Sequence, residues 1–445
     1  MESKQTILRP FYLKQLRSRA WNGQIKVVTG IRRCGKSFLL FNLFKRRLLD
    51  EGVPSGNIVE IALDEERFEP LRNPVRLAEH VRARLRGKKG PRFVLIDEIQ
   101  LAYPVLPPGV DPARVAPEAR KRLYTTFYDV LNELRALPDT DVYVTGSNSE
   151  TLSSDVATNF RDRGFEIRLH PLRFSEYLAA TGLEKGEAFQ EYLVWGGMPL
   201  AVLERDATAR SAYLKGLFER VYLKDIRERR KIRDEFVLGR TVDVLASAVG
   251  SLTNPHRIVS SLRSAAGTKT TERTMQKYLR YLEESFLFSK ARRYDVKGRR
   301  YLDYPEKYYA EDVGLRNARL NFRQTEPSHL MENVVYNELV ARGCNVDVGV
   351  VPIASRDAEG RQSVVQHEID FVVNLGLGKV YVQSAFRIPD EEKRAKETLP
   401  LRKSGDFFRK IVVTDGFQRP LAGEDGIVTV GVIPFLLDPG ILLGS

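Results

Sequence analysis

The sequence predicts an α/β fold whose first domain is a parallel sheet covered by helices. Short apolar, β-branched runs alternate with helical segments through residues 1–170, and a glycine-rich loop joins the first run to a helix. A chain of 445 residues is also too long for one hydrophobic core, so further domains are expected to follow. The apolar content of 42% and the charged content of 29% are typical of globular proteins.

The strands of this sheet are expected at five short apolar runs. Each run has the length of a buried strand and is separated from the next by a helical segment, which is the pattern of strands that pair in parallel. The five predicted strands are residues 24–29, 57–63, 92–97, 141–146 and 165–169. A helix is predicted at 38–49, where apolar residues recur with helical spacing.

The loop between the first strand and this helix has the spacing of a nucleotide-binding loop. Gly30, Gly35, Lys36 and Ser37 occupy the fixed positions of G-x-x-x-x-G-K-S, in the required order of strand, loop and helix. Such a loop directs backbone N–H groups at phosphates, with Lys36 reaching the β- and γ-phosphates and Ser37 ligating Mg²⁺. The prediction is therefore an ATP and Mg²⁺ site, to which the neighbouring Arg33, Cys34 and Phe38 are also assigned.

A second acidic strand completes this prediction. Residues 92–97 end in Asp97 and Glu98, at the edge of a parallel sheet where ligands bind. Asp97 is expected to hold Mg²⁺ through water, and Glu98 to polarise the attacking water, which predicts hydrolysis. Ser147 or Asn148, after the fourth strand, is expected to contact the γ-phosphate or the water. Arg163 is a candidate finger for the nucleotide of a neighbouring subunit, which leaves a homo-oligomer open.

Positive charge is concentrated in the middle of the chain. The net charge is +13, and residues 221–300 alone carry 19 Lys and Arg against 9 Asp and Glu, an excess of +10. This bias favours a polyanion such as nucleic acid, and solvated basic helix faces are the alternative. Two cysteines cannot form a disulfide framework, the N-terminus has no apolar signal core, and no run of 18 apolar residues occurs. The expected location is cytoplasmic, with no membrane partner.

The basic region contains the pattern of a winged helix. Helices are predicted at 256–265 and 271–290, followed by a hairpin at 291–302. An apolar stripe on the second helix is expected to be buried: Met275, Tyr278, Leu279, Leu282 and Phe286. The residues expected to contact nucleic acid, DNA rather than RNA, lie on another face and in the hairpin: Arg273, Lys277, Arg280, Lys297 and Arg299. The alternative is a winged helix that contacts protein or covers the nucleotide.

Several segments in order resemble those of a prokaryotic AAA-type P-loop ATPase family: GIRRCGKS, IDEIQ, VTGSNS, HPLRFSEYL, WGGMP and YLKDI. Its members carry a C-terminal domain of uncharacterised function related to PD-(D/E)XK nucleases, and the resemblance covers nearly the whole chain. It implies an ATPase core at 1–170, a helical lid at 171–235, a winged helix at 236–315 and a degenerate, restriction-endonuclease-like α/β domain at 316–445. It also gives nucleotide roles to Gly35, Lys36, Ser37, Asp97 and Glu98. The proline-rich insertion at 103–122 departs from the family and is a candidate partner-specific loop.

The C-terminal segment matches half of the nuclease pattern that this resemblance implies. Glu332 lies on a predicted helix at 329–343, and Glu368 and Asp370 lie on a predicted strand. The next strand should carry E-x-K but carries Gln383, Ser384 and Ala385. A neutral amide is a poor Mg²⁺ ligand and alanine cannot orient water, so the site is expected to be degenerate. Lys379 or Lys393 remains open as a replacement for the missing lysine.

Three functions follow from these observations. The first is an ATP-hydrolysing switch that acts on or with nucleic acid. The second is an ATP-dependent switch with an unidentified protein partner, and the third is an ATP-regulated nuclease. The basic middle of the chain favours the first over the second, and Gln383 with Ala385 weighs against the third.

Overall fold

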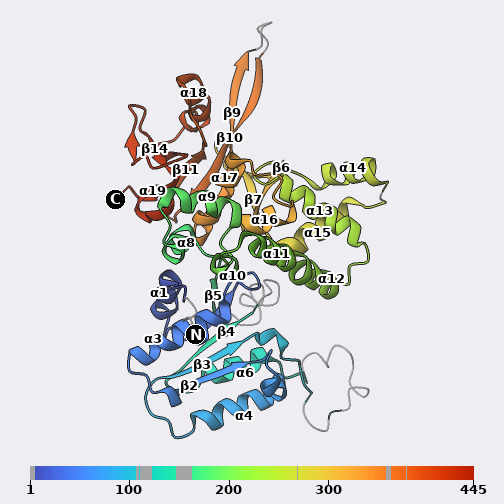
Figure 1. Ribbon diagram of the computed structural model, residues 1–445, viewed down its shortest axis with the longest axis vertical. Helices are drawn as coiled ribbons and strands as arrows, with labels where there is room; N and C mark the ends of the chain where they lie inside the picture. The colour runs from blue at the N-terminus through green and yellow to red at the C-terminus, as the bar shows by residue number, and fades with distance from the viewer. Residues whose placement is uncertain are drawn as a thin grey trace. The chain divides into compact units, whose positions relative to one another are not determined.

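The computed structural model describes residues 6–106, 110, 123–146, 163–267, 269–356, 362–376 and 378–444. The chain divides into two compact units, Lys4–His170 and Pro171–Ser445, and each is described by itself (Figure 1). Among the described residues, no helix combines the length and the apolar character needed to cross a membrane.

The first unit is built on a five-stranded sheet in the order β2-β3-β4-β1-β5, with every pairing parallel. Its strands are β1 Ile25–Thr29, β2 Ile58–Ala62, β3 Arg92–Asp97, β4 Thr140–Thr145 and β5 Gly164–Arg168. All five begin and end within one residue of the predicted ranges, which confirms the parallel α/β core. Because β4 lies between β1 and β3, the ends of these strands meet at one edge of the sheet.

Helices cover both faces of this sheet. On one face, α4 (Pro74–Leu85) and α6 (Phe127–Arg135) bury alternate residues of the strands in a hydrophobic core (Figure 1). On the other face, Phe44 packs against Phe93 and Tyr143, with ring centroids 6.3 and 4.7 Å apart. Phe44 belongs to the helix after the glycine loop. This helix consists of α2 (Lys36–Phe38), the π-helical η1 (Leu39–Phe44) and α3 (Lys45–Asp50). The remaining elements among the described residues of this unit are α1 (Pro10–Ser18), η2 (Ser55–Asn57), η3 (Glu66–Arg72) and η4 (Ile99–Leu101).

The second unit begins with helices that are fixed to a later part of the chain. These helices are α8 Phe174–Thr181, α9 Lys185–Trp195, α10 Pro199–Leu203, α11 Ala207–Leu217, η6 Phe218–Leu223 and α12 Lys224–Arg230. After α9, the backbone N–H of Gly197 donates to the Asp312 carboxylate at 2.6 Å. Asn317, on α16 (Val313–Arg319), donates to the last carbonyls of α9, those of Leu193 and Val194, at 2.9 Å each. The motif WGGMP is therefore the point where α9 is hydrogen-bonded to the start of α16.

Two helices that were predicted for a winged helix, α14 (Pro255–Ala266) and α15 (Glu272–Glu284), follow α13 (Glu235–Ser247). The five residues of the predicted apolar stripe are all buried, so that prediction is confirmed. The predicted end of the second helix at residue 290 is wrong. The helix ends at Glu284 because Phe286 takes a left-handed backbone conformation, φ +57°, before β7 begins at Phe288.

A nine-stranded sheet connects this region to the C-terminal residues. Its order is β13-β14-β12-β11-β10-β9-β7-β8-β6. In chain order the strands are β6 Leu252–Thr253, β7 Phe288–Asp295, β8 Arg300–Ala310, β9 Asn345–Arg356, β10 Gln362–Asn374, β11 Lys379–Ser384, β12 Arg409–Thr414, β13 Leu421–Ala422 and β14 Ile427–Gly431. The helices α17 (Pro327–Ala341), α18 (Glu391–Arg402), α19 (Val432–Leu437) and η7 (Pro439–Leu442) complete the unit.

The predicted hairpin at 291–302 belongs to this same sheet. Its two strands are β7 and β8, and β7 pairs in parallel with β9, which places Arg293 opposite Val348. The predicted boundary between residues 315 and 316 therefore does not separate two sheets. Beyond the rest of the sheet, β9 and β10 extend as a long antiparallel hairpin (Figure 1).

Candidate nucleotide-binding site and a buried carboxylate cluster

The glycine loop has the backbone conformation that its sequence requires. Gly30 has φ +135°, and a Cβ atom there would lie 2.1 Å from the carbonyl oxygen of Leu169. Gly35 has φ +99° and precedes the first helical residue, Lys36. Both backbone conformations are ones that residues with side chains rarely adopt. The two glycines therefore allow the loop to curl at the N-terminus of its helix.

Lys36 is held inside this loop. Its side chain is buried, and its ammonium donates to the carbonyl oxygens of Gly30 at 2.9 Å and Ile31 at 3.2 Å. These bonds hold the positive charge against the loop's own backbone, at the start of the helix. A phosphate at this helix N-terminus would be within the field of both the ammonium and the helix dipole.

Ser37 and Asp97 come together although 60 residues separate them. The Asp97 carboxylate accepts hydrogen bonds from the hydroxyls of Ser37 and Thr145. Burial raises the pKa of Asp97, and these two hydrogen bonds offset part of that rise. A hydroxyl and a carboxylate oxygen are the hard ligands that Mg²⁺ prefers, so this pair fits the predicted metal role.

Thr145 is a site residue that the sequence analysis did not find. It is the last residue of β4 and is fully buried. Besides donating to Asp97, its hydroxyl accepts the backbone N–H of Glu98 at 3.0 Å. One hydroxyl therefore links the carboxylate of Asp97 to the backbone of Glu98.

Glu98 has a strained backbone. Its φ of +53° is in the left-handed region, which is uncommon for a residue with a side chain and is often found at functional sites. Its carboxylate accepts a hydrogen bond from the side-chain amide of Gln100. The strand turns sharply here, so the side chains of Asp97 and Glu98 do not follow the alternation of a regular strand.

Cys34 and Arg9 attach the loop to the end of β5. The thiol of Cys34 is buried and donates to the carbonyl of Leu169 at 3.4 Å. Arg9, which is also buried, donates to the carbonyls of Cys34 at 3.3 Å and His170 at 2.8 Å. Nothing in the sequence around Arg9 indicated this contact, because its partners lie 25 and 161 positions away.

The other residues predicted for this site are spread around it or undescribed. Arg33 is exposed within the loop, and Phe38 is exposed on the helix that follows it. Ser147 and Asn148 lie outside the described residues, as does most of the proline-rich insertion at 103–122. Arg163 is exposed immediately before β5, and its backbone carbonyl accepts from Ile25 at 2.7 Å.

The predicted nucleic-acid residues differ in their surroundings. Arg273 and Lys277 are exposed on α15, on a different face from its buried stripe. Arg280 is also exposed but forms an ion pair with Glu284 at 3.3 Å. In the hairpin, Lys297 donates to the carbonyl of Pro352 at 2.9 Å, and Arg299 is exposed with φ +52°.

The acidic residues predicted for a nuclease-like site do meet, around a lysine that was not predicted. The Lys307 ammonium on β8 lies 2.9 Å from Glu332 Oε1, 2.5 Å from Glu368 Oε1 and 3.2 Å from Asp370 Oδ1. Lys379 and Lys393, the suggested replacements, are engaged elsewhere. Lys379 donates to the Tyr294 hydroxyl at 3.0 Å, and Lys393 pairs with Glu397 at 2.7 Å.

Gln383 stands beside this cluster and is hydrogen-bonded on both sides. Its carbonyl oxygen accepts the backbone N–H of Asp370 at 3.2 Å, and its amide nitrogen donates to Glu397 at 3.1 Å. Burial, together with the neighbouring charge of Asp370, raises the pKa of Glu332 to about 7. In the part of the chain that the structure describes, no group of three or more His, Cys, Asp or Glu is arranged to hold a metal ion.

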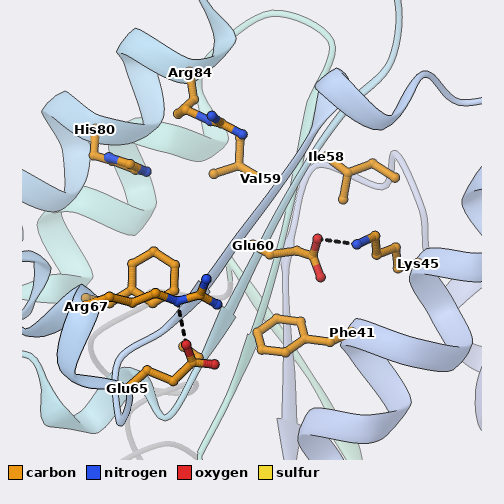
Figure 2. A pocket seen from close by; sticks show the side chains of 11 residues that line it. Phe41, Lys45, Ile58, Val59, Glu60, Glu65, Arg67, His80 and Arg84 are labelled. Carbon is orange, nitrogen blue, oxygen red and sulfur yellow. Dashed lines mark hydrogen bonds and ion pairs between the residues drawn. The ribbon is translucent and has the colours of Figure 1, made fainter.

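A cavity of about 450 Å³ lies beside the edge strand β2 and contains none of the predicted nucleotide residues. Figure 2 shows Glu60 directed at Lys45 and Arg67 at Glu65, and these ion pairs measure 2.6 and 2.5 Å. Its walls also include Phe41, Phe68, His80 and Arg84. The cavity is thus a feature of the sheet edge and not of the glycine loop.

Comparison with protein families matches two segments of the chain. Residues 22–178 match an AAA domain, and residues 186–326 match a domain of unknown function. The whole chain is 30% identical over 440 residues to an uncharacterized protein of Haemophilus influenzae, covering 98% of this chain and 100% of that protein. It is 23% identical over 435 residues to an uncharacterized protein of Methanocaldococcus jannaschii, covering 93% and 87% of the two chains.

Similar solved structures are remote. An Aeropyrum pernix ORC1 protein in complex with DNA is 14% identical and covers 72% of this chain and 94% of its own, with a TM-score of 0.27. An S. cerevisiae Hsp104–ADP complex is 12% identical and covers 76% of this chain and 44% of its own, with a TM-score of 0.28. Both TM-scores are too low for an argument about fold or partner.

Proposed function

The chain belongs to the same family as the Haemophilus influenzae protein and carries an AAA domain, and on that premise we propose that it is an ATP-hydrolysing molecular switch. The observation that carries this proposal is the meeting of three parts at one sheet edge. Lys36 lies inside the glycine loop, Ser37 hydrogen-bonds Asp97, and Thr145 joins Asp97 to Glu98.

The residues of the loop have separate tasks in this proposal. The ammonium of Lys36 leaves the carbonyls of Gly30 and Ile31 to contact the β- and γ-phosphates, while loop N–H groups hold the remaining phosphate oxygens. Mg²⁺, when bound, supplies positive charge that stabilises the charge developing on the phosphates. Ser37 and Asp97 are the residues that would hold it.

Glu98 is proposed to orient the attacking water. Its strained backbone is fixed by the N–H bond to Thr145, and its carboxylate is bonded to Gln100. We assign Ser147 or Asn148 to sense the γ-phosphate and Arg163 to act on a neighbouring subunit's nucleotide, both from sequence position alone.

Replacing Lys36 tests the nucleotide site. Lys36→Ala removes the mobile cation of the loop, so we expect ATP affinity to fall by about tenfold or more, as measured with a fluorescent ATP analogue. Lys45→Ala is the matched control, because Lys45 lies on the same continuous helix and pairs with Glu60. ATP affinity equal to that of the parent in Lys36→Ala would overturn the proposed site.

We further propose that the switch acts on nucleic acid, DNA rather than RNA. Support comes from the excess of +10 in residues 221–300 and from Arg273 and Lys277, which are exposed one helical turn apart. In this proposal residues 171–235 form a lid, and 236–315 supply the helices of a winged helix whose hairpin strands, β7 and β8, join the C-terminal sheet. Residues 316–445 supply the rest of a degenerate nuclease-like domain retained for binding.

A protein partner is the second candidate. The observation that favours it is the engagement of two predicted DNA contacts within the chain, Lys297 with Pro352 and Arg280 with Glu284. The salt dependence of DNA affinity distinguishes the two candidates. Neutralising DNA phosphates releases counterions, so the affinity of a DNA-binding protein falls steeply as the salt concentration rises. If the protein does not bind DNA even at low salt, the protein partner is favoured.

A further inference from the structure

The carboxylates that a nuclease would use for metal surround a buried ammonium. Lys307 comes from β8, Glu332 from α17, and Glu368 and Asp370 from β10. Only 4% of the Lys307 side chain is exposed. Its nitrogen lies within 3.2 Å of an oxygen of all three carboxylates, at 2.9, 2.5 and 3.2 Å. A single cation therefore sits where the three acidic side chains converge.

We propose that the Lys307 ammonium takes the place of a divalent cation in this cluster, so that the chain itself supplies the cation that the three carboxylates share. The cluster then binds no metal and fixes β8 to α17 and β10. This inference does not depend on the ATP-dependent switch proposed above, because its residues lie within the second unit and take no part in the glycine loop.

The hydrogen bonds around the cluster support this assignment. Asp370 has both carboxylate oxygens engaged, Oδ1 by Lys307 and Oδ2 by the backbone N–H of Ser384 at 2.9 Å. Glu332 Oε1 accepts from Lys307 and also from the Tyr309 hydroxyl at 2.8 Å. A divalent cation needs these same lone pairs, so it competes with donors that are already part of the fold.

Lys307 does not fit the other role that a lysine has in a nuclease. A lysine that accepts a proton from water must lose its own proton near neutral pH. Burial alone would lower the pKa of Lys307, but Glu332, Asp370 and Glu368 together raise it well above its ordinary value. The side chain therefore stays charged, which suits a counter-ion and not a base.

Removing Lys307 should convert the cluster into a metal site. Lys307→Met keeps similar length and volume but removes the ammonium that contacts all three carboxylates, which is strongly destabilising. Carboxylate oxygens are ligands for Mn²⁺, so a divalent cation can replace the lost charge. Lys379→Met is the matched control, because Lys379 lies in the same sheet and contacts Tyr294 instead of a carboxylate.

The test measures melting temperature in nucleotide-free protein with EDTA and with Mn²⁺. We expect Mn²⁺ near a hundred times its dissociation constant to raise the melting temperature of Lys307→Met by about 5 °C. The parent and Lys379→Met should stay within about 1 °C, and Lys307→Met should melt below both in EDTA. The proposal is overturned if Mn²⁺ does not raise the melting temperature of Lys307→Met. It is also overturned if Mn²⁺ raises the melting temperature of the parent by as much as that of Lys307→Met.

A second measurement decides the question if Lys307→Met does not fold. Mn²⁺ binding to the parent and to Asp370→Asn is counted by electron paramagnetic resonance, again without nucleotide. Equal numbers of bound Mn²⁺ in the two proteins support Lys307 as the resident cation. Loss of one Mn²⁺ in Asp370→Asn would show that the parent already holds a metal there and overturn the proposal.

Discussion

Thr145 shows how one side chain organises the proposed catalytic edge of the first unit. Its hydroxyl donates to Asp97 and accepts from the backbone of Glu98, so it fixes both acidic residues at once. Sequence position alone favoured Ser147 or Asn148, which follow the same strand. Thr145 could not be chosen over them without the pairing of β3 with β4, which brings its hydroxyl to the end of β3.

Replacing Thr145 with valine keeps the shape of the side chain and removes the hydroxyl. Asp97 then loses a donor and the Glu98 N–H loses its acceptor, so we expect kcat for ATP hydrolysis to fall by about ten- to a hundredfold. ATP affinity should change by less than about threefold. Thr140→Val, at the other end of β4, is the control. A kcat equal to that of the parent in Thr145→Val would remove Thr145 from the proposed mechanism.

Lys307 marks the limit of prediction at the scale of single residues. Glu332, Asp370 and Gln383 were predicted because each stands at a recognisable position of a motif. Lys307 stands in no motif, and its three partners are 25, 61 and 63 positions away along the chain. Its place follows from the long-range pairing of β8 within the nine-stranded sheet, which periodicity does not reveal.

At the scale of elements, prediction was most accurate where burial sets the pattern. Four strands of the first sheet, β1 to β4, were predicted within one residue because each is a short, largely buried run. The edge strand β5 was also predicted within one residue, although only Ile167 of its five residues is buried. The helix predicted at 271–290 was too long, because the apolar residues Phe286, Leu287 and Phe288 continue its hydrophobic run after the helix has ended. Periodicity identified the buried face of α15, and it could not locate the turn that stops it.

The exposed face of α15 carries a prediction of its own. Arg273→Ala combined with Lys277→Ala should weaken DNA binding and reduce the salt slope of log affinity by about 2, because two phosphate contacts are lost. The basal ATPase rate should not change. The control, Arg76→Ala with Arg86→Ala, removes equal charge from exposed positions in the first unit. The same slope in the α15 variant and the parent would favour a protein partner.

At the scale of the whole molecule, the parallel α/β core of the first unit was predictable, and the organisation of the second unit was not. Motif order placed the glycine loop, the acidic strand and the carboxylates. It did not show that β7 and β8 join the C-terminal strands in one sheet. A switch changes conformation on hydrolysis only if ATP and ADP favour its conformations to different degrees. A test of the switch must therefore measure ATP binding and ATP hydrolysis separately.

The most direct test of the proposed switch compares ATP binding and ATP hydrolysis in the parent and in Glu98→Gln. The substitution removes the charge that orients water and leaves Lys36, Ser37 and Asp97 in place. We expect ATP affinity within about threefold of the parent and hydrolysis slower by about a hundredfold or more. Hydrolysis by Glu98→Gln at the parent rate, or a parent that binds ATP with Mg²⁺ and never hydrolyses it, would contradict the account.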